Sequence, residues 1–122
     1  MTREQRDLLL KDLCARLPYG VKGEKYTIRM DGEFVPLIDV EVIIAEDIIT
    51  LNGCPGYMIR PYLFPLSSMT EEQKTSHNFL KHSAYANPIK LVDWYNKNHF
   101  DYRGLIPMGL AIDATGKNIY QL

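Results

Sequence analysis

The spacing of apolar residues changes along this chain, and this change constrains the fold more than any other feature. Leu9, Leu13 and Leu17 are four residues apart, as on one side of a helix. Between Tyr26 and Met30, apolar and polar residues alternate, as on a strand with one buried face. Because neither element can bury its apolar side alone, helix and sheet must pack together, and the chain is predicted to have an α+β fold.

The first helix has recognisable start and stop signals. Thr2 and Gln5 form the pattern of a capping box, so the helix is predicted to begin after Thr2. Residues 18–20, Pro-Tyr-Gly, are predicted to end it. Leu10 and Cys14 lie beside the leucine stripe, and Cys14 is interpreted as a small core residue.

Residues 31–32, Asp-Gly, are typical of a two-residue type I′ hairpin turn. Such a turn would place Ile28 opposite Val35, so apolar residues would meet across the hairpin. The alternation then changes parity, which predicts a β-bulge or a break within residues 36–38.

Two further extended segments, residues 48–51 and 57–64, complete a predicted small, curled, antiparallel sheet of about four strands. An SH3-like arrangement is one candidate for this sheet. A possible last short strand lies at residues 118–120.

Two helices are predicted in the C-terminal half. Overlapping capping boxes at residues 68–71 and 70–73 predict a helix that runs to about His82. Residues 87–88, Asn-Pro, predict the start of a second helix. The buried side of that helix is predicted to carry Ile89, Val92 and Tyr95. Residues 94–112 are predicted to pack against the leucine stripe and one face of the sheet.

Length and charge limit the function classes. A chain of 122 residues is predicted to form one domain, residues 1–122, and needs no metal, cofactor or disulfide for its stability. The net charge of −1 argues against a dedicated nucleic-acid binder. Residues 30–73 nevertheless hold one basic and eight acidic side chains. This acidic middle either steers a basic partner or is a solvated face of the sheet.

The sequence also indicates a compartment. Its two cysteines form no disulfide framework, which favours a reducing environment. The first residues lack the apolar core of a signal peptide, and no apolar run is long enough to cross a membrane. The protein is therefore predicted to be cytoplasmic, without membrane contact.

The densest polar cluster follows the last predicted helix. His99, Asp101, Tyr102 and Arg103, with Trp94 before them, are candidate binding residues. His99 and Asp101 could form an acid–base pair. In the alternative, structural interpretation, the helix ends at residues 98–99, Asp101 caps the next turn, and Arg103 satisfies a carbonyl or a carboxylate.

A second candidate surface lies on the predicted sheet. Tyr57, Arg60 and Tyr62 could stack single-stranded bases if they are exposed. The acidic charge around them opposes phosphate binding.

Metal binding is not predicted. His77 and His82 are five residues apart, on different sides of a helix. Asp39 and Glu41 share a strand face, which suits either a divalent ion or solvated carboxylates. No catalytic residue is assigned, because no nucleophile elbow, phosphate-binding loop or dinucleotide motif occurs.

Three stretches, residues 10–21, 61–72 and 93–113, together resemble a family of small uncharacterised proteins encoded by phages, prophages and mobile elements of gut bacteria. The resemblance implies that the chain acts inside a bacterial host cell. It implies no activity, so no residue inherits a role from it.

The leading hypothesis is a non-enzymatic accessory protein of a phage or mobile element that binds an unidentified protein. A host defence complex is a candidate target, and a homo-oligomer is left open. The alternatives are a nucleic-acid-associated module and a small enzyme that uses His99 and Asp101.

Overall fold

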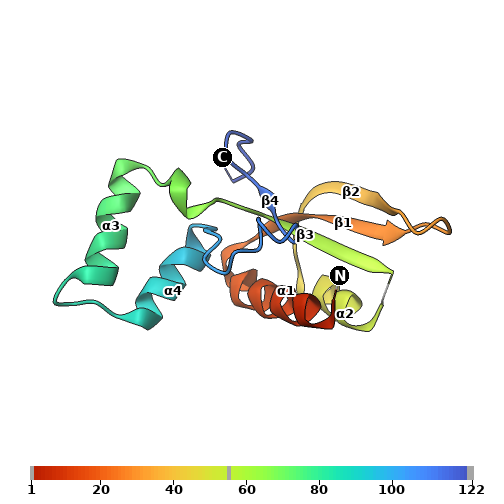
Figure 1. Cartoon of the computed structure of the whole chain (residues 1–122), viewed down its shortest axis with the longest axis horizontal. Coiled ribbons are helices and arrows are strands. Elements are labelled where there is room, and N and C mark those ends of the chain that lie inside the picture. Colours follow the sequence, from red (N-terminus) through yellow and green to blue (C-terminus); the bar gives the residue numbers. More distant parts are fainter. Residues whose placement is uncertain (1, 55, 121–122) are drawn as a thin grey trace.

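A computed structural model describes residues 2–54 and 56–120, apart from the side chains of residues 38 and 39. It confirms the α+β class, with an N-terminal helix, a curled four-stranded sheet and two C-terminal helices (Figure 1). The elements are α1 (Arg3–Arg16), the 3-10 turn η1 (Leu17–Tyr19), β1 (Lys22–Ile28), β2 (Phe34–Val42), α2 (Ala45–Gly53), β3 (Tyr57–Leu63), the 3-10 turn η2 (Leu66–Ser68), α3 (Glu71–His82), α4 (Pro88–Lys97) and β4 (Ile112–Asp113).

The signals at the ends of α1 act as the sequence predicts. The Gln5 amide donates to the Thr2 hydroxyl over 3.0 Å, and the Gln5 side chain accepts from the Thr2 amide over 3.0 Å. Gly20, at φ 68°, follows the 3-10 turn that ends the helix. Leu9 and Leu13 are fully buried, so the predicted leucine stripe faces the core.

One prediction for α1 is wrong. Cys14 is exposed, while the charged residues Asp12 and Arg16 are fully buried. The spacing of apolar residues locates a buried stripe but not its exact width, because a charged pair can be buried when other parts of the fold supply its partners.

The β1–β2 hairpin has a three-residue loop rather than the predicted two-residue turn. The Gly32 amide donates to the Arg29 carbonyl over 2.9 Å, and Gly32 has a φ of 88°. This is a turn followed by a left-handed glycine, the usual form of a three-residue hairpin. Ile28 therefore faces Phe34 rather than Val35. Both loops place a glycine at positive φ, so the Asp-Gly pair alone does not distinguish them.

The predicted bulge in β2 is confirmed. Tyr26 pairs with Pro36 and Lys25 pairs with Ile38, so Leu37 is the extra residue. The bulge lies inside the range expected from the change of parity, because a single inserted residue exchanges the two faces of a strand.

The sheet has the order β2-β1-β3-β4, and β4 runs parallel to β3. It is therefore mixed rather than wholly antiparallel. Its fourth strand comes from the C-terminal tail, not from residues 48–51, and residues 118–120 form no strand. The two helices α1 and α2 lie on the same side of the sheet (Figure 1).

The predicted strand at residues 48–51 lies inside α2. The Ile44 amide donates to the Asp47 carboxylate over 2.9 Å, which caps the start of this helix. Leu51 is buried and Ile49 is exposed, as on a helix with one buried side. A short apolar run fits a strand and a buried helix equally well, which explains the error.

The helices α3 and α4 begin where their caps predict. The Gln73 amide donates to the Thr70 hydroxyl over 3.1 Å. The side chain of Asn87 accepts from the amides of Ile89 and Lys90 over 3.0 and 3.3 Å. The predicted end of α3 at His82 is also confirmed.

Buried apolar residues form two clusters rather than one shared core. The larger cluster includes Leu9 and Leu13 of α1 together with Leu105 and Leu110, so the tail packs on the leucine stripe as predicted. The smaller cluster consists of Met69, Tyr95 and Phe100, with Phe64, Leu91, Trp94 and Tyr102 packed against it.

The structure does not bury all of the predicted core. Ile89 and Val92 of α4 are exposed, as are Ile28, Val40 and Val42 of the sheet. In α4 the buried side is centred on Tyr95, with Leu91 and Trp94 beside it, because that side faces the smaller cluster. The assignment of the chain to one domain stays a prediction.

Candidate functional site

A buried carboxylate joins α1 to the polar cluster after α4. Asp12 Oδ2 accepts from Arg16 Nε over 2.8 Å, and Asp12 Oδ1 accepts from Arg103 Nε over 3.1 Å. Asp12 and Arg16 are both 0% exposed. Arg16 Nη2 also donates to the Phe100 carbonyl over 2.6 Å. This arrangement confirms the structural interpretation of Arg103, which satisfies a carboxylate.

Tyr102 is held by the same two arginines. The guanidinium carbons of Arg16 and Arg103 lie 5.3 and 4.8 Å from the centre of its ring. Arg103 Nη2 donates to the Tyr102 hydroxyl over 2.9 Å. The ring also stacks on Tyr95, with the centres 5.2 Å apart. Tyr102 and Arg103 therefore connect α1 to α4.

His99 and Asp101 do not form an acid–base pair. The two carboxylate oxygens of Asp101 accept from the backbone amides of Leu105 and Ile106 over 2.8 and 2.9 Å. Asp101 thus caps the following turn, as the structural interpretation predicts. The His99 ring instead stacks on Tyr120, with the ring centres 3.6 Å apart.

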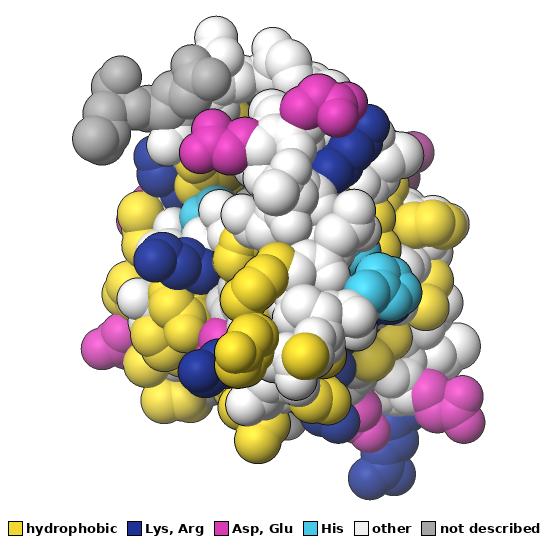
Figure 2. Space-filling view, turned by 90° about the vertical axis from the view of Figure 1, so that its left-hand side faces the viewer, with side chains coloured by type: hydrophobic (Ala, Val, Ile, Leu, Met, Phe, Trp, Pro, Cys, Tyr) yellow, Lys and Arg dark blue, Asp and Glu magenta, His cyan; other side chains and the backbone are white. Residues whose placement is uncertain are grey.

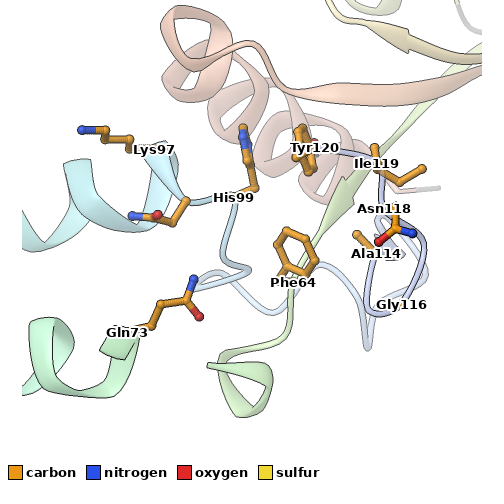
Figure 3. A pocket seen from close by; sticks show the side chains of 10 residues that line it. Phe64, Gln73, Lys97, His99, Ala114, Gly116, Asn118, Ile119 and Tyr120 are labelled. Carbon is orange, nitrogen blue, oxygen red and sulfur yellow. The ribbon is translucent and has the colours of Figure 1, made fainter. Parts of the chain in front are cut away.

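His99 lies beside a pocket of about 380 Å³. Figure 3 shows its ring next to that of Tyr120, with Gln73 and Lys97 on one side and Asn118 on the other. Burial, together with the positive charges of Arg16 and Lys22, lowers the pKa of His99 to about 4. The ring is therefore neutral at pH 7. The pocket is lined by Phe64, Gln73, Lys97, Asn98, His99, Ala114, Gly116, Asn118, Ile119 and Tyr120.

Tyr120 fixes the C-terminal segment to the sheet. Its hydroxyl accepts from the Lys22 amide over 2.9 Å and donates to the Tyr62 carbonyl over 2.6 Å. Burial raises the pKa of this hydroxyl. These hydrogen bonds fix Tyr120, and therefore one side of the pocket beside His99, in place. None of the residues that line the pocket is a carboxylate that could pair with the histidine.

The sheet candidates do not form a stacking surface. Tyr62 is buried, and its hydroxyl donates to the Glu24 carboxylate. The Arg60 guanidinium lies over the Tyr26 ring, 5.3 Å from its centre. Tyr57 is half-buried on the opposite, helix-covered side, where burial and the charge of Asp47 raise the pKa of its hydroxyl. Tyr57 and Tyr62 therefore do not form a pair of exposed rings on which single-stranded bases could stack.

Trp94 belongs to the smaller core. It stacks on Phe100 with the ring centres 5.4 Å apart, and the His77 ring lies 5.9 Å from it. His77 Nε2 lies 2.7 Å from the Tyr95 hydroxyl oxygen, so this half-buried histidine connects α3 to α4.

Metal ligands do not gather among the residues that the structure describes, where no group of three or more His, Cys, Asp or Glu side chains could hold an ion. The predicted pair of Asp39 and Glu41 involves a side chain, that of Asp39, outside the described residues. Glu41 lies 3.6 Å from Lys25, which also pairs with Asp47 at 2.8 Å.

A patch of exposed apolar side chains covers α3 and α4. None of the residues of α3, all of which are described, is buried. The α3–α4 patch consists of Phe79, Tyr85, Ile89 and Val92, which are 53, 78, 75 and 37% exposed. Figure 2 views this end of the molecule and shows hydrophobic side chains gathered on it, with basic and acidic side chains around them. Sequence reasoning missed this patch because it assigned two of the four residues to the core.

A second apolar surface lies on β2 and its hairpin. The β2 patch consists of Ile28, Met30, Phe34, Val40 and Val42, all exposed. Strand β2 stands at the edge of the sheet, with β1 on one side and no other described strand beyond it. Exposed apolar patches on a folded domain commonly mark interaction surfaces.

Comparisons with protein-family models, curated proteins and solved structures find no match to this chain. Among the described residues, no helix is long and apolar enough to cross a membrane.

Proposed function

We propose that this protein acts by binding another protein, as a cytoplasmic accessory factor of a phage or mobile element. The observation that carries the proposal is α3, a helix of 12 residues with no buried side chain, beside the exposed α3–α4 patch. Isolated helices of this length are marginal in water. Burial of the patch by a partner would stabilise α3 and supply the binding energy together.

The composition of the patch indicates the chemistry of the partner. Phe79 and Tyr85 stack on each other with ring centres 6.2 Å apart, which provides a rigid aromatic anchor. Residues 71–97, which span α3 and α4, contain four lysines, two glutamates and one aspartate. The glutamates lie in the first turn of α3, whereas Lys81 and Lys90 follow Phe79 and Ile89 of the patch along the chain. These lysines attract a partner whose apolar contact region is bordered by carboxylates.

The resemblance to proteins of phages and mobile elements supports a partner from the bacterial host. In this proposal the partner is a subunit of a host defence complex, and the protein inhibits the complex by covering one of its surfaces. The cell that expresses the defence system should then become more sensitive to infection when this protein is produced.

The test compares three forms of the full chain in affinity purifications from host cells. The wild type should recover a stoichiometric partner, and Ile89→Asp should lose it, because the substitution puts a charge in the patch. Met108→Asp is the matched control, since Met108 is an exposed apolar side chain outside the patch. Circular dichroism should show that all three are folded.

The recovered partner is then purified and its affinity for each form is measured. Binding that is at least tenfold weaker for Ile89→Asp, normal for Met108→Asp and weaker at high salt supports the proposal. Recovery of no stoichiometric partner from several hosts contradicts protein binding. Equal binding of both variants contradicts the assignment of the surface.

A further inference from the structure

We propose that the α3–α4 patch of one copy docks on the β2 patch of a second copy of this chain. The inference goes beyond the proposed function, because it gives the same α3–α4 surface a second occupant, another copy of this chain, in the absence of a host partner. Three features of the structure support it: the exposure of both patches, their opposite charges and their places at opposite ends of the molecule.

The β2 patch lies at the uncovered hairpin end of one sheet face, beyond the buried Tyr26 and Met58 of the same face. Side chains alternate along a strand, and Lys25 of β1 points to the helix-covered face, where it pairs with Asp47 of α2. The neighbouring positions therefore point to the other face. Ile28 lies there beside Phe34, its partner across the hairpin. An exposed helix stripe and an open sheet face are the two kinds of surface that pack together in α+β proteins.

The charges around the patches are complementary. Residues 22–42, which form β1, β2 and the hairpin between them, hold five acidic and three basic side chains. Residues 71–97, which include α3 and α4, hold three acidic and four basic side chains. The two surfaces therefore differ in the sign of their net charge, which favours contact between unlike patches over contact between like patches.

The position of the patches requires two molecules. Figure 1 shows α3 and α4 at one end of the long axis and the β1–β2 hairpin at the other end. The two surfaces cannot cover each other within one chain. Each copy offers one surface of each kind, so the contact is head-to-tail and can continue into rings or short chains.

Sedimentation velocity on the wild-type full chain gives the first test. We expect a weight-average mass that rises with protein concentration and passes beyond the dimer, with weaker association at high salt. A mass that stays at the monomer value at every concentration and at low salt overturns the inference. A mass that does not rise beyond the dimer value also overturns the inference, unless the variants below show that the dimer is a closed head-to-tail pair.

Two variants, each with one damaged surface, provide the sharper test. Ile89→Asp damages the α3–α4 patch and Val40→Lys damages the β2 patch, and both side chains are exposed, so the fold should be kept. Each variant alone should be monomeric. Their mixture should form a 1:1 dimer and nothing larger, because one intact surface of each kind remains. Met108→Asp should associate like the wild type.

The remaining outcomes are equally decisive. If Ile89→Asp alone still associates, the β2 patch pairs with itself and the inference is wrong. If Val40→Lys alone still associates, the α3–α4 patch pairs with itself and the inference is again wrong. Failure of self-association leaves the proposed function standing, since a host protein can still bind the α3–α4 patch.

Discussion

Replacement of Asp12 by alanine tests whether one buried carboxylate holds α1 to the C-terminal part of the chain. Asp12 binds Arg16 at 2.8 Å and Arg103 at 3.1 Å, and Asp12 and Arg16 are 0% exposed. Without the carboxylate, the charge of Arg16 stays buried without a counter-ion. Removal of one partner of a buried ion pair costs about 3–5 kcal/mol, so we expect Asp12→Ala to lower the free energy of unfolding by that amount.

The reciprocal substitution should cost less. In Arg16→Met the carboxylate of Asp12 keeps its contact with Arg103, whose side chain is 17% exposed. In the double variant Asp12→Leu/Arg16→Met, apolar volume replaces the two fully buried charges, and only the partly exposed Arg103 loses its carboxylate partner. Such replacements are often neutral or stabilising by about 1–4 kcal/mol. The double variant should therefore be clearly more stable than Asp12→Ala.

Urea unfolding followed by circular dichroism and by the fluorescence of Trp94, the only tryptophan, measures these free energies. In a thermal scan, Asp12→Ala should lower Tm by about 10–20 °C. Lys74→Ala is the control, because its pair with Glu71 at 3.2 Å is exposed and should contribute less than about 1 kcal/mol. The reasoning is refuted if the free energy of unfolding of Asp12→Ala lies within about 1 kcal/mol of the wild-type value. It is also refuted if the double variant is no more stable than Asp12→Ala.

Three further substitutions test other parts of the structure. The folded chain holds the pKa of His99 near 4, below the ordinary value of 6.5, so the free energy of unfolding should fall as the pH falls from 6.5 towards 4. His99→Gln should weaken this dependence, which urea midpoints at several pH values measure. Gly23→Ala should cost about 1–3 kcal/mol, because its Cβ would lie 2.8 Å from the Arg60 carbonyl oxygen, whereas Gly53→Ala, with nothing within 4 Å, should cause no loss. Leu13→Ala should cost about 2–5 kcal/mol in the same urea assay, and a cost below about 1 kcal/mol would contradict its place in the main core.

The sequence by itself predicted the features that depend on neighbouring residues. The caps at Thr2, Thr70 and Asn87 occur where expected, because a cap needs only a side chain and an amide two or three positions away. The bulge at Leu37 was also predictable, since a change in alternation is visible within a few residues. The α+β class followed from these local patterns.

The candidate site shows where local reasoning ends. The cluster from His99 to Arg103 was recognised as unusual, and its structural interpretation is confirmed. Its partner Asp12, however, lies 91 positions from Arg103 in the sequence, and no local pattern connects the two. The position of His99 is a second example, because its ring stacks on Tyr120, 21 positions further along the chain, and not against Asp101, whose carboxylate accepts from the nearby amides of Leu105 and Ile106.

Only the tertiary structure decided which apolar side of each element is covered. Residues 48–51 fit a strand or a helix, and their packing in α2 settles the choice. Ile89 and Val92 look like core residues in the sequence, yet α4 turns Tyr95 inward and leaves them exposed. Burial depends on which elements meet across the whole chain, whereas sequence spacing shows only that one side of each element is apolar. The two exposed patches, on which the proposed interactions depend, are therefore a property of the assembled fold.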